Sequence, residues 1–399
     1  MTPPRVIAFR ACGAALVLMT LAGCNMLRRI PMPPRRTTLE SQLIELPAQT
    51  ISNHLIVETR WDKKGPYHFL IDTGASVTLV SPELAARYSD TSAPPIPQTQ
   101  VRVKAADGST ALLPAVTLRR LSLGQARFER VPALVYDCSA LSAHFGIKID
   151  GVLGFPLFRD TLLTLDYPRS RVLLVPNSSP PPSLPGSTIL FNNASRTPLI
   201  PVTLGDETFI ALIDSGSDGA LNLNPVGLHA TFDYGPRPGP ALATLTGDRP
   251  QQVGRVAQSL QIGGYTFMHP IVALTDDLAS LGGDVLKNFT VTFDQRRSQV
   301  TFYRESAAPI LMPSRRSAGL SFDKTPVYWR ITSVVPGSPA ETAGIQAGDL
   351  CTRIEGELIA GWNLRRYEEL TANAKSITFT FLRGTREQDT SVAVFDLVP

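Results

Sequence analysis

The chain has 399 residues, 43% of them hydrophobic and 18% charged, which is the composition of a globular protein with room for about two to four domains. Its 34 prolines and 29 glycines indicate many turns and argue against long helices, so we expect a mainly β or α+β fold. The formal net charge of +4, without a basic stripe interleaved with aromatic residues, excludes nucleic acid as an expected partner.

The first 24 residues have the layout of a secretory signal. Arg5 and Arg10 precede the apolar run 11–20, which is too short to span a bilayer permanently. The run ends in Leu-Ala-Gly and then Cys24, and this resembles the bacterial lipobox. We therefore expect residues 1–23 to be a lipoprotein signal peptide and Cys24 to carry a lipid that anchors the protein to a membrane. The alternative is an ordinary signal with an incidental cysteine.

The expected signal peptide and lipid anchor also bear on where the protein is located and on whether its cysteines are free or paired. Asn25 favours the outer membrane of the cell envelope, with the folded part in the periplasm or otherwise outside the cytoplasm. Only Cys138 and Cys351 then remain available for pairing. We expect two buried free thiols, with a disulfide between them as the alternative.

Clusters of chain-breaking residues divide the chain beyond the signal. The basic, proline-rich segment 24–50 is typical of a tether. Further breaker clusters at 176–186 and 309–317 separate three blocks, with predicted boundaries 51–175, 188–305 and 317–399.

The first two blocks repeat one another. In each, an apolar run, 67–71 or 209–213, ends directly at an acid, a hydroxyl residue and glycine. One such triplet alone favours an Asp-initiated turn, whereas two at matched positions indicate a shared function. The triplets are Asp72-Thr73-Gly74 and Asp214-Ser215-Gly216, and hairpin signals follow at Asp107-Gly108 and Gly247-Asp248.

This pair of triplets, each followed by a flap-like hairpin and a later apolar-Gly turn, resembles the retropepsin-like aspartic proteases, and two copies in one chain resemble the bilobal pepsin form. The resemblance implies two duplicated β-barrel lobes and an aspartic endopeptidase acting on polypeptides, without metal or cofactor and with a monomeric catalytic unit. It implies that Asp72 and Asp214 are the catalytic pair, that Thr73 and Ser215 tie the two loops together, and that Gly74 and Gly216 form tight turns.

The residue after each triplet differs between the halves. Ala75 follows the first triplet and Ser217 the second. Only the serine side chain can donate a hydrogen bond to its neighbouring carboxylate, and such donation lowers a pKa. We therefore expect Asp214 to hold the negative charge and Asp72 the proton.

Two departures from the family pattern leave alternatives open. Ser280 stands where an apolar residue is usual, and neither hairpin tip carries the tyrosine of the pepsin flap. The chain could therefore be a non-catalytic peptide-binding lipoprotein, or an active homodimer. The five histidines show no metal-ligand spacing, which argues against a metal site and favours ordinary surface or strand histidines.

The third block, about 317–399, resembles a PDZ domain through its Gly-Ser-Pro-Ala and Ala-Gly-Ile turns. The resemblance implies an α+β module that captures C-terminal or extended peptides at a sheet edge. The carboxylate-binding loop would be Gly319-Leu320-Ser321-Phe322, with serine where glycine is usual. The module would recruit substrates or regulate the protease. The alternative is a domain docked on the protease core with its groove closed.

Overall fold

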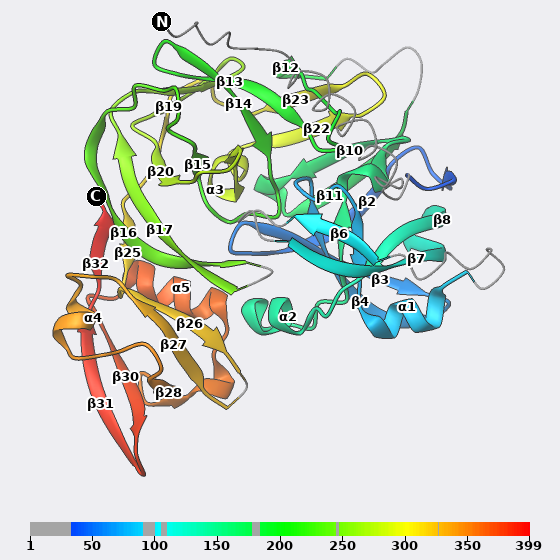
Figure 1. The fold of residues 1–399 in the computed structure, drawn as a ribbon. Coiled ribbons are helices and arrows are strands. Elements are labelled where there is room, and N and C mark those ends of the chain that lie inside the picture. The colour runs from blue at the N-terminus through cyan, green and yellow to red at the C-terminus, as the bar shows by residue number, and fades with distance from the viewer. Residues whose placement is uncertain (1–32, 91–99, 105–109, 178–183, 245–246, 326) are drawn as a thin grey trace, which may run out of the picture. The chain divides into compact units, whose positions relative to one another are not determined.

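The computed structural model describes residues 33–90, 100–104, 110–177, 184–244, 247–325 and 327–399 (Figure 1). Strands dominate these residues and form sheets of 14, 10, six and two strands, so the mainly β fold is confirmed. The predicted signal peptide, Cys24 and the hairpin tip at Asp107 and Gly108 lie outside the described residues. Among the residues that are described, no helix is long and apolar enough to cross a membrane.

The predicted tether is shorter than the sequence suggested, because residues 36–51 form two strands. β1 (Arg36–Leu39) pairs with β8, and β2 (Ile44–Ile51) lies between β11 and β3. Ile44 and Leu46 of β2 are buried in the main core. The burial of their side chains outweighs the local proline content, which had favoured a tether.

The first lobe is built around a long β hairpin and a pair of parallel strands. Its elements are β3 (His54–Trp61), β4 (Lys64–Asp72), β5 (Thr78–Val80), α1 (Pro82–Tyr88), β6 (Gln100–Lys104), β7 (Thr110–Leu123), β8 (Ala126–Val135), α2 (Ser139–Phe145), β9 (Gly151–Gly154), η2 (Phe155–Phe158), β10 (Thr161–Asp166), η3 (Tyr167–Arg169) and β11 (Arg171–Pro176).

The second lobe repeats the strand order of the first, with β13–β14 in place of β3–β4. Its elements are β12 (Ser187–Leu190), β13 (Leu199–Leu204), β14 (Glu207–Ile213), β15 (Leu221–Leu223), β16 (Phe232–Thr244), β17 (Gly247–Val256), β18 (Leu260–Ile262), β19 (Tyr265–Met268), β20 (Ile271–Leu274), β21 (Ala279–Leu281), α3 (Gly283–Leu286), β22 (Thr290–Asp294), β23 (Gln299–Tyr303) and β24 (Ile310–Leu311).

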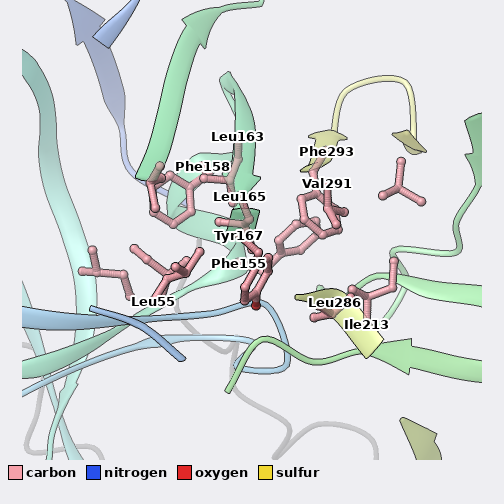
Figure 2. Packing of buried hydrophobic residues seen from close by; sticks show 14 of the residues in the cluster. Leu55, Phe155, Phe158, Leu163, Leu165, Tyr167, Ile213, Leu286, Val291 and Phe293 are labelled. Atoms are coloured by element: carbon pink, nitrogen blue, oxygen red, sulfur yellow. The ribbon is translucent and has the colours of Figure 1, made fainter. Parts of the chain in front are cut away.

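One sheet runs through both lobes. β10 of the first lobe pairs antiparallel with β22 of the second, with Thr164 opposite Thr292 and their hydroxyls 2.9 Å apart. Figure 2 shows apolar side chains of these strands packed with Phe155, whose ring meets Phe293 edge to face at 5.3 Å. A continuous sheet and core therefore hold the two triplet-bearing halves together within one chain.

The third block has its own core around Trp329, Ile331, Phe379 and Phe381. Its elements are β25 (Arg315–Ser317), β26 (Leu320–Lys324), β27 (Trp329–Val334), α4 (Pro339–Thr342), β28 (Leu350–Ile354), β29 (Glu357–Leu358), η4 (Ile359–Gly361), α5 (Leu364–Asn373), β30 (Ser376–Arg383), β31 (Arg386–Ala393) and β32 (Phe395–Val398).

The expectation of two buried free thiols is confirmed. Cys138, at the start of α2, and Cys351, in β28, are both buried and unpaired with each other. Burial raises the pKa of each thiol to about 12, so both stay protonated at neutral pH.

Candidate active site

Each triplet lies at the end of a strand whose last residues are largely buried. β4 ends at Asp72 and β14 ends just before Asp214. β9 runs parallel to β4 with Gly154 beside Asp72, and β21 runs parallel to β14 with Leu281 beside Ile213. The apolar-Gly segments predicted as turns thus lie at the ends of β9 and β21, in equivalent positions beside the two strands that lead to the aspartates.

The hydroxyls of Thr73 and Ser215 join the two loops through four hydrogen bonds. Thr73 Oγ1 donates to the Ile213 carbonyl at 2.7 Å, and Ser215 Oγ donates to the Ile71 carbonyl at 2.8 Å. Each hydroxyl also accepts from the other residue's amide, at 2.9 Å for the Thr73 amide and 3.0 Å for the Ser215 amide. Both side chains are fully buried, so this symmetric network fixes the separation of the two strand ends.

The glycines allow each loop to approach the opposite carboxylate. A Cβ at Gly74 would lie 2.4 Å from Asp214 Oδ1, and a Cβ at Gly216 would lie 2.4 Å from Asp72 Cγ. No side chain fits at these distances. The two carboxyl groups are close enough that the charge of Asp72 raises the pKa of Asp214, and neighbouring carboxyl groups of this kind share one proton.

The two carboxylates receive different numbers of amide hydrogen bonds. Asp72 Oδ1 accepts from the amides of Gly74 at 2.8 Å and Ala75 at 3.0 Å. Among the residues that the structure describes, only the Gly216 amide donates to Asp214 Oδ1, at 3.0 Å. Charge is therefore better stabilised on Asp72.

The expected distribution of charge was wrong for this reason. Within the described residues the Ser217 hydroxyl makes no hydrogen bond to Asp214, and its amide bonds instead to the Asp214 backbone carbonyl at 3.4 Å. Burial, and next the charge of Asp72, raise the pKa of Asp214 to about 8. Burial also raises the pKa of Asp72, but the two amides and His54 oppose that rise. Asp214 therefore holds the shared proton and Asp72 the charge.

Sequence reasoning missed two groups beside the pair. His54 is only 5% exposed and contacts the Gly216 carbonyl, although its spacing had suggested an ordinary surface or strand histidine. Tyr167 is buried just after β10, and burial and then the charges of Asp214 and Asp72 raise the pKa of its hydroxyl. A long-range strand pairing places both residues, so no local sequence signal could have found them.

The hairpins predicted to act as flaps are present as strand pairs. β6 pairs with β7, up to Lys104 opposite Thr110. In the second lobe Gly247 and Asp248 begin β17 and pair with Thr244 and Ala243 of β16, which forms the long green hairpin in Figure 1.

Only Gly319 of the predicted carboxylate loop precedes the edge strand, because Leu320, Ser321 and Phe322 belong to β26 itself. Gly319 has a φ of +79°, and β26 lies at the end of the sheet order β26-β27-β28-β30-β31. The Ser321 hydroxyl accepts from the Ala241 amide of β16 at 2.9 Å. The Ser52 hydroxyl donates to the Glu368 carboxylate of α5 at 2.8 Å. This block is therefore in contact with both protease-like lobes.

Across the described parts of the chain, no group of three or more His, Cys, Asp or Glu side chains is arranged to hold a metal ion.

Residues 57–157 match the family model described as aspartyl protease, and residues 330–383 match that of a PDZ domain. The chain carries an aspartyl protease domain and a C-terminal PDZ domain. The match to the aspartyl protease model runs from β3 to η2 and contains Asp72, while the second lobe rests on the structural duplication described above. No curated protein matches the chain.

Two solved structures are similar to the PDZ part. A PDZ domain protein from Parabacteroides distasonis ATCC 8503 is 19% identical, covers 21% of this chain and 21% of its own, and has a TM-score of 0.19. The HtrA3 PDZ domain bound to a phage-derived ligand is 18% identical, covers 21% of this chain and 88% of its own, and also has a TM-score of 0.19. The chain thus spans about a fifth of the first structure.

Proposed function

We propose that this chain is an aspartic endopeptidase that hydrolyses peptide bonds with a water molecule activated between Asp72 and Asp214. The observation that carries the proposal is that the Thr73 and Ser215 network joins the two triplet loops, so that the glycine of each loop lies against the carboxyl group of the other. Two adjacent carboxyl groups that share one proton supply both an acid and a base without a metal or a covalent nucleophile.

The unequal environments assign the two roles. Ionised Asp72 removes a proton from the water as its oxygen attacks the peptide carbonyl carbon. Protonated Asp214 donates its hydrogen bond to the carbonyl oxygen, where negative charge develops. The proton that Asp72 has taken then passes to the leaving nitrogen as the C–N bond breaks.

These roles predict a bell-shaped dependence of kcat/KM on pH. Activity falls in acid as Asp72 becomes protonated, at a pH above that of an ordinary aspartate because its pKa is raised. Activity falls in alkali as Asp214 loses its proton, near pH 8. Cleavage of an unfolded protein by the full chain in detergent, measured from about pH 3 to about pH 10, tests this. A wild-type protein that cuts nothing over this range would instead support a non-catalytic peptide-binding lipoprotein.

We further propose that the PDZ domain binds C-terminal or extended peptides at β26 and so recruits polypeptide substrates or regulates cleavage. The edge position of β26 and the left-handed Gly319 before it support peptide addition as an extra strand. The lipobox-like sequence at Cys24 supports attachment to an envelope membrane. Mass spectrometry of the N-terminus of the mature protein tests the anchor, because an unmodified Cys24 contradicts it.

A further inference from the structure

His54 is placed against the active-site loops by a tight turn between β2 and β3. Ser52 and Asn53 both have positive φ, of 47° and 63°, which is the geometry of a two-residue hairpin turn. Asn53 Nδ2 donates to the Asp218 carbonyl at 3.2 Å and to Asp284 Oδ1 at 2.9 Å. The turn is therefore fixed to the second lobe although it belongs to the first.

Both ring nitrogens of His54 face atoms that can only accept hydrogen bonds. Nδ1 lies 3.2 Å from the Ile51 carbonyl oxygen, and Nε2 lies 3.1 Å from the Gly216 carbonyl oxygen. A neutral imidazole has one N–H and would leave one nitrogen lone pair facing a carbonyl oxygen. The doubly protonated ring satisfies both contacts, and the side chain is 5% exposed, so water cannot readily substitute.

Charged groups from several elements lie near His54. Asp72 is close enough for a positively charged His54 to oppose the rise of the Asp72 pKa. His144 of α2 also faces His54, but burial, chiefly, and then Lys324 lower the pKa of His144 to about 4, so it is neutral. Asp218, by contrast, raises the pKa of His144. The Phe145 ring of α2 also contacts His54, at 5.0 Å in an edge contact.

We infer that His54 is a positioning residue of the proposed peptidase: a buried imidazolium that holds the Asp214 loop through the Gly216 carbonyl and keeps Asp72 ionised. The inference rests on the proposed function for its catalytic meaning, while the charge of the ring follows from the hydrogen-bond geometry alone. The His54 imidazolium gives the pair of aspartates a fixed positive charge on the Asp72 side. That charge adds to the two amide hydrogen bonds of Gly74 and Ala75 in favouring ionised Asp72.

The ring charge is tested on the full chain in detergent with ¹⁵N-labelled histidine, the His54 signals being identified by their loss in His54→Gln. We expect both ring nitrogens to carry protons at neutral pH. A neutral His54 ring at that pH overturns the inference.

Kinetics test the positioning role. His54→Gln should lower kcat by about tenfold or more and move the acid limb of kcat/KM upward by about half a pH unit or more, because Asp72 loses its neighbouring positive charge. His229→Gln is the matched control: it removes a histidine that is 94% exposed and should change neither value. An unshifted acid limb in a folded His54→Gln variant contradicts the role. If the wild type cuts nothing yet His54 is doubly protonated, the proposed function fails and the ring charge stands.

Discussion

Asp72 and Asp214 occupy the same position in two copies of one motif, but their carboxylates accept different numbers of backbone amide hydrogen bonds. The Ala75 amide turns toward the Asp72 carboxylate, while the corresponding amide of Ser217 turns toward a backbone carbonyl. A comparison of side chains favoured the opposite charge assignment, because only the serine carries a hydroxyl donor. Amide direction depends on φ and ψ, which the residue letters at this position do not specify.

A second test at the level of a single residue concerns the buried hydroxyl of Tyr167. Within the described residues its buried hydroxyl has no hydrogen-bond partner, and such a group costs about 1–3 kcal/mol of stability. Tyr167→Phe should therefore raise the free energy of unfolding by about 1 kcal/mol. Urea unfolding followed by tryptophan fluorescence measures this.

Tyr88→Phe is the matched control for this substitution. Tyr88 is equally buried, but its hydroxyl donates to the Trp61 carbonyl at 3.2 Å and contacts the Tyr67 hydroxyl at 3.1 Å. Its removal should destabilise the protein. If Tyr167→Phe is as destabilising as Tyr88→Phe, the Tyr167 hydroxyl has a partner and the prediction is wrong.

At the level of elements, the two strand-ending loops act as one unit through the buried Thr73 and Ser215. Thr73→Val removes one donated and one accepted hydrogen bond and leaves the Ile213 carbonyl and the Ser215 amide unpaired. We expect a loss of about 2–4 kcal/mol in unfolding free energy and a fall in kcat of about tenfold or more. Denaturation and steady-state kinetics on the same preparations measure both.

Thr164→Val is the control that shows whether losing any hydrogen bond between the lobes lowers kcat, or only losing one in the triplet loops. Thr164 also bonds across the lobes, to Thr292 at 2.9 Å, but it lies in the middle of β10 and not in a triplet loop. This variant should lose about 1 kcal/mol and keep its kcat. Equal kcat values for Thr73→Val and Thr164→Val would show that the loop network does not position the aspartates.

Local pattern predicted the elements that carry the site but not all their boundaries. The apolar runs before each triplet became β4 and β14, because short runs of apolar and aromatic residues bounded by turn signals favour strands. β2 was missed because its alternation of buried and exposed residues is short and contains Pro47. The packing of Ile44 and Leu46 into a distant core decided that strand, and a single sequence does not show such packing.

At the scale of the molecule, the internal repeat predicted that two halves would meet, and the structure shows where. Pairing of β10 with β22 joins residues that are 128 positions apart at Thr164 and Thr292, and no local signal marks which strands cross between the lobes. That shared sheet places Tyr167 and, through the β2–β3 turn, His54 beside the aspartates. The bilobal fold was therefore predictable from repetition, while the surroundings of the dyad depended on pairing that only the fold defines.

The central claim is that one chain supplies both aspartates of a single dyad. Equimolar mixing of Asp72→Asn with Asp214→Asn tests it most directly, with the initial rate of cleavage of an unfolded protein as the measurement. We expect each variant alone to lose about a thousandfold or more in kcat/KM, roughly the cost of removing an essential acid or base, and the mixture to recover nothing. Recovery toward a quarter of the wild-type rate would mean that the dyad forms between two chains, and full activity in either single variant would mean that the pair is not catalytic.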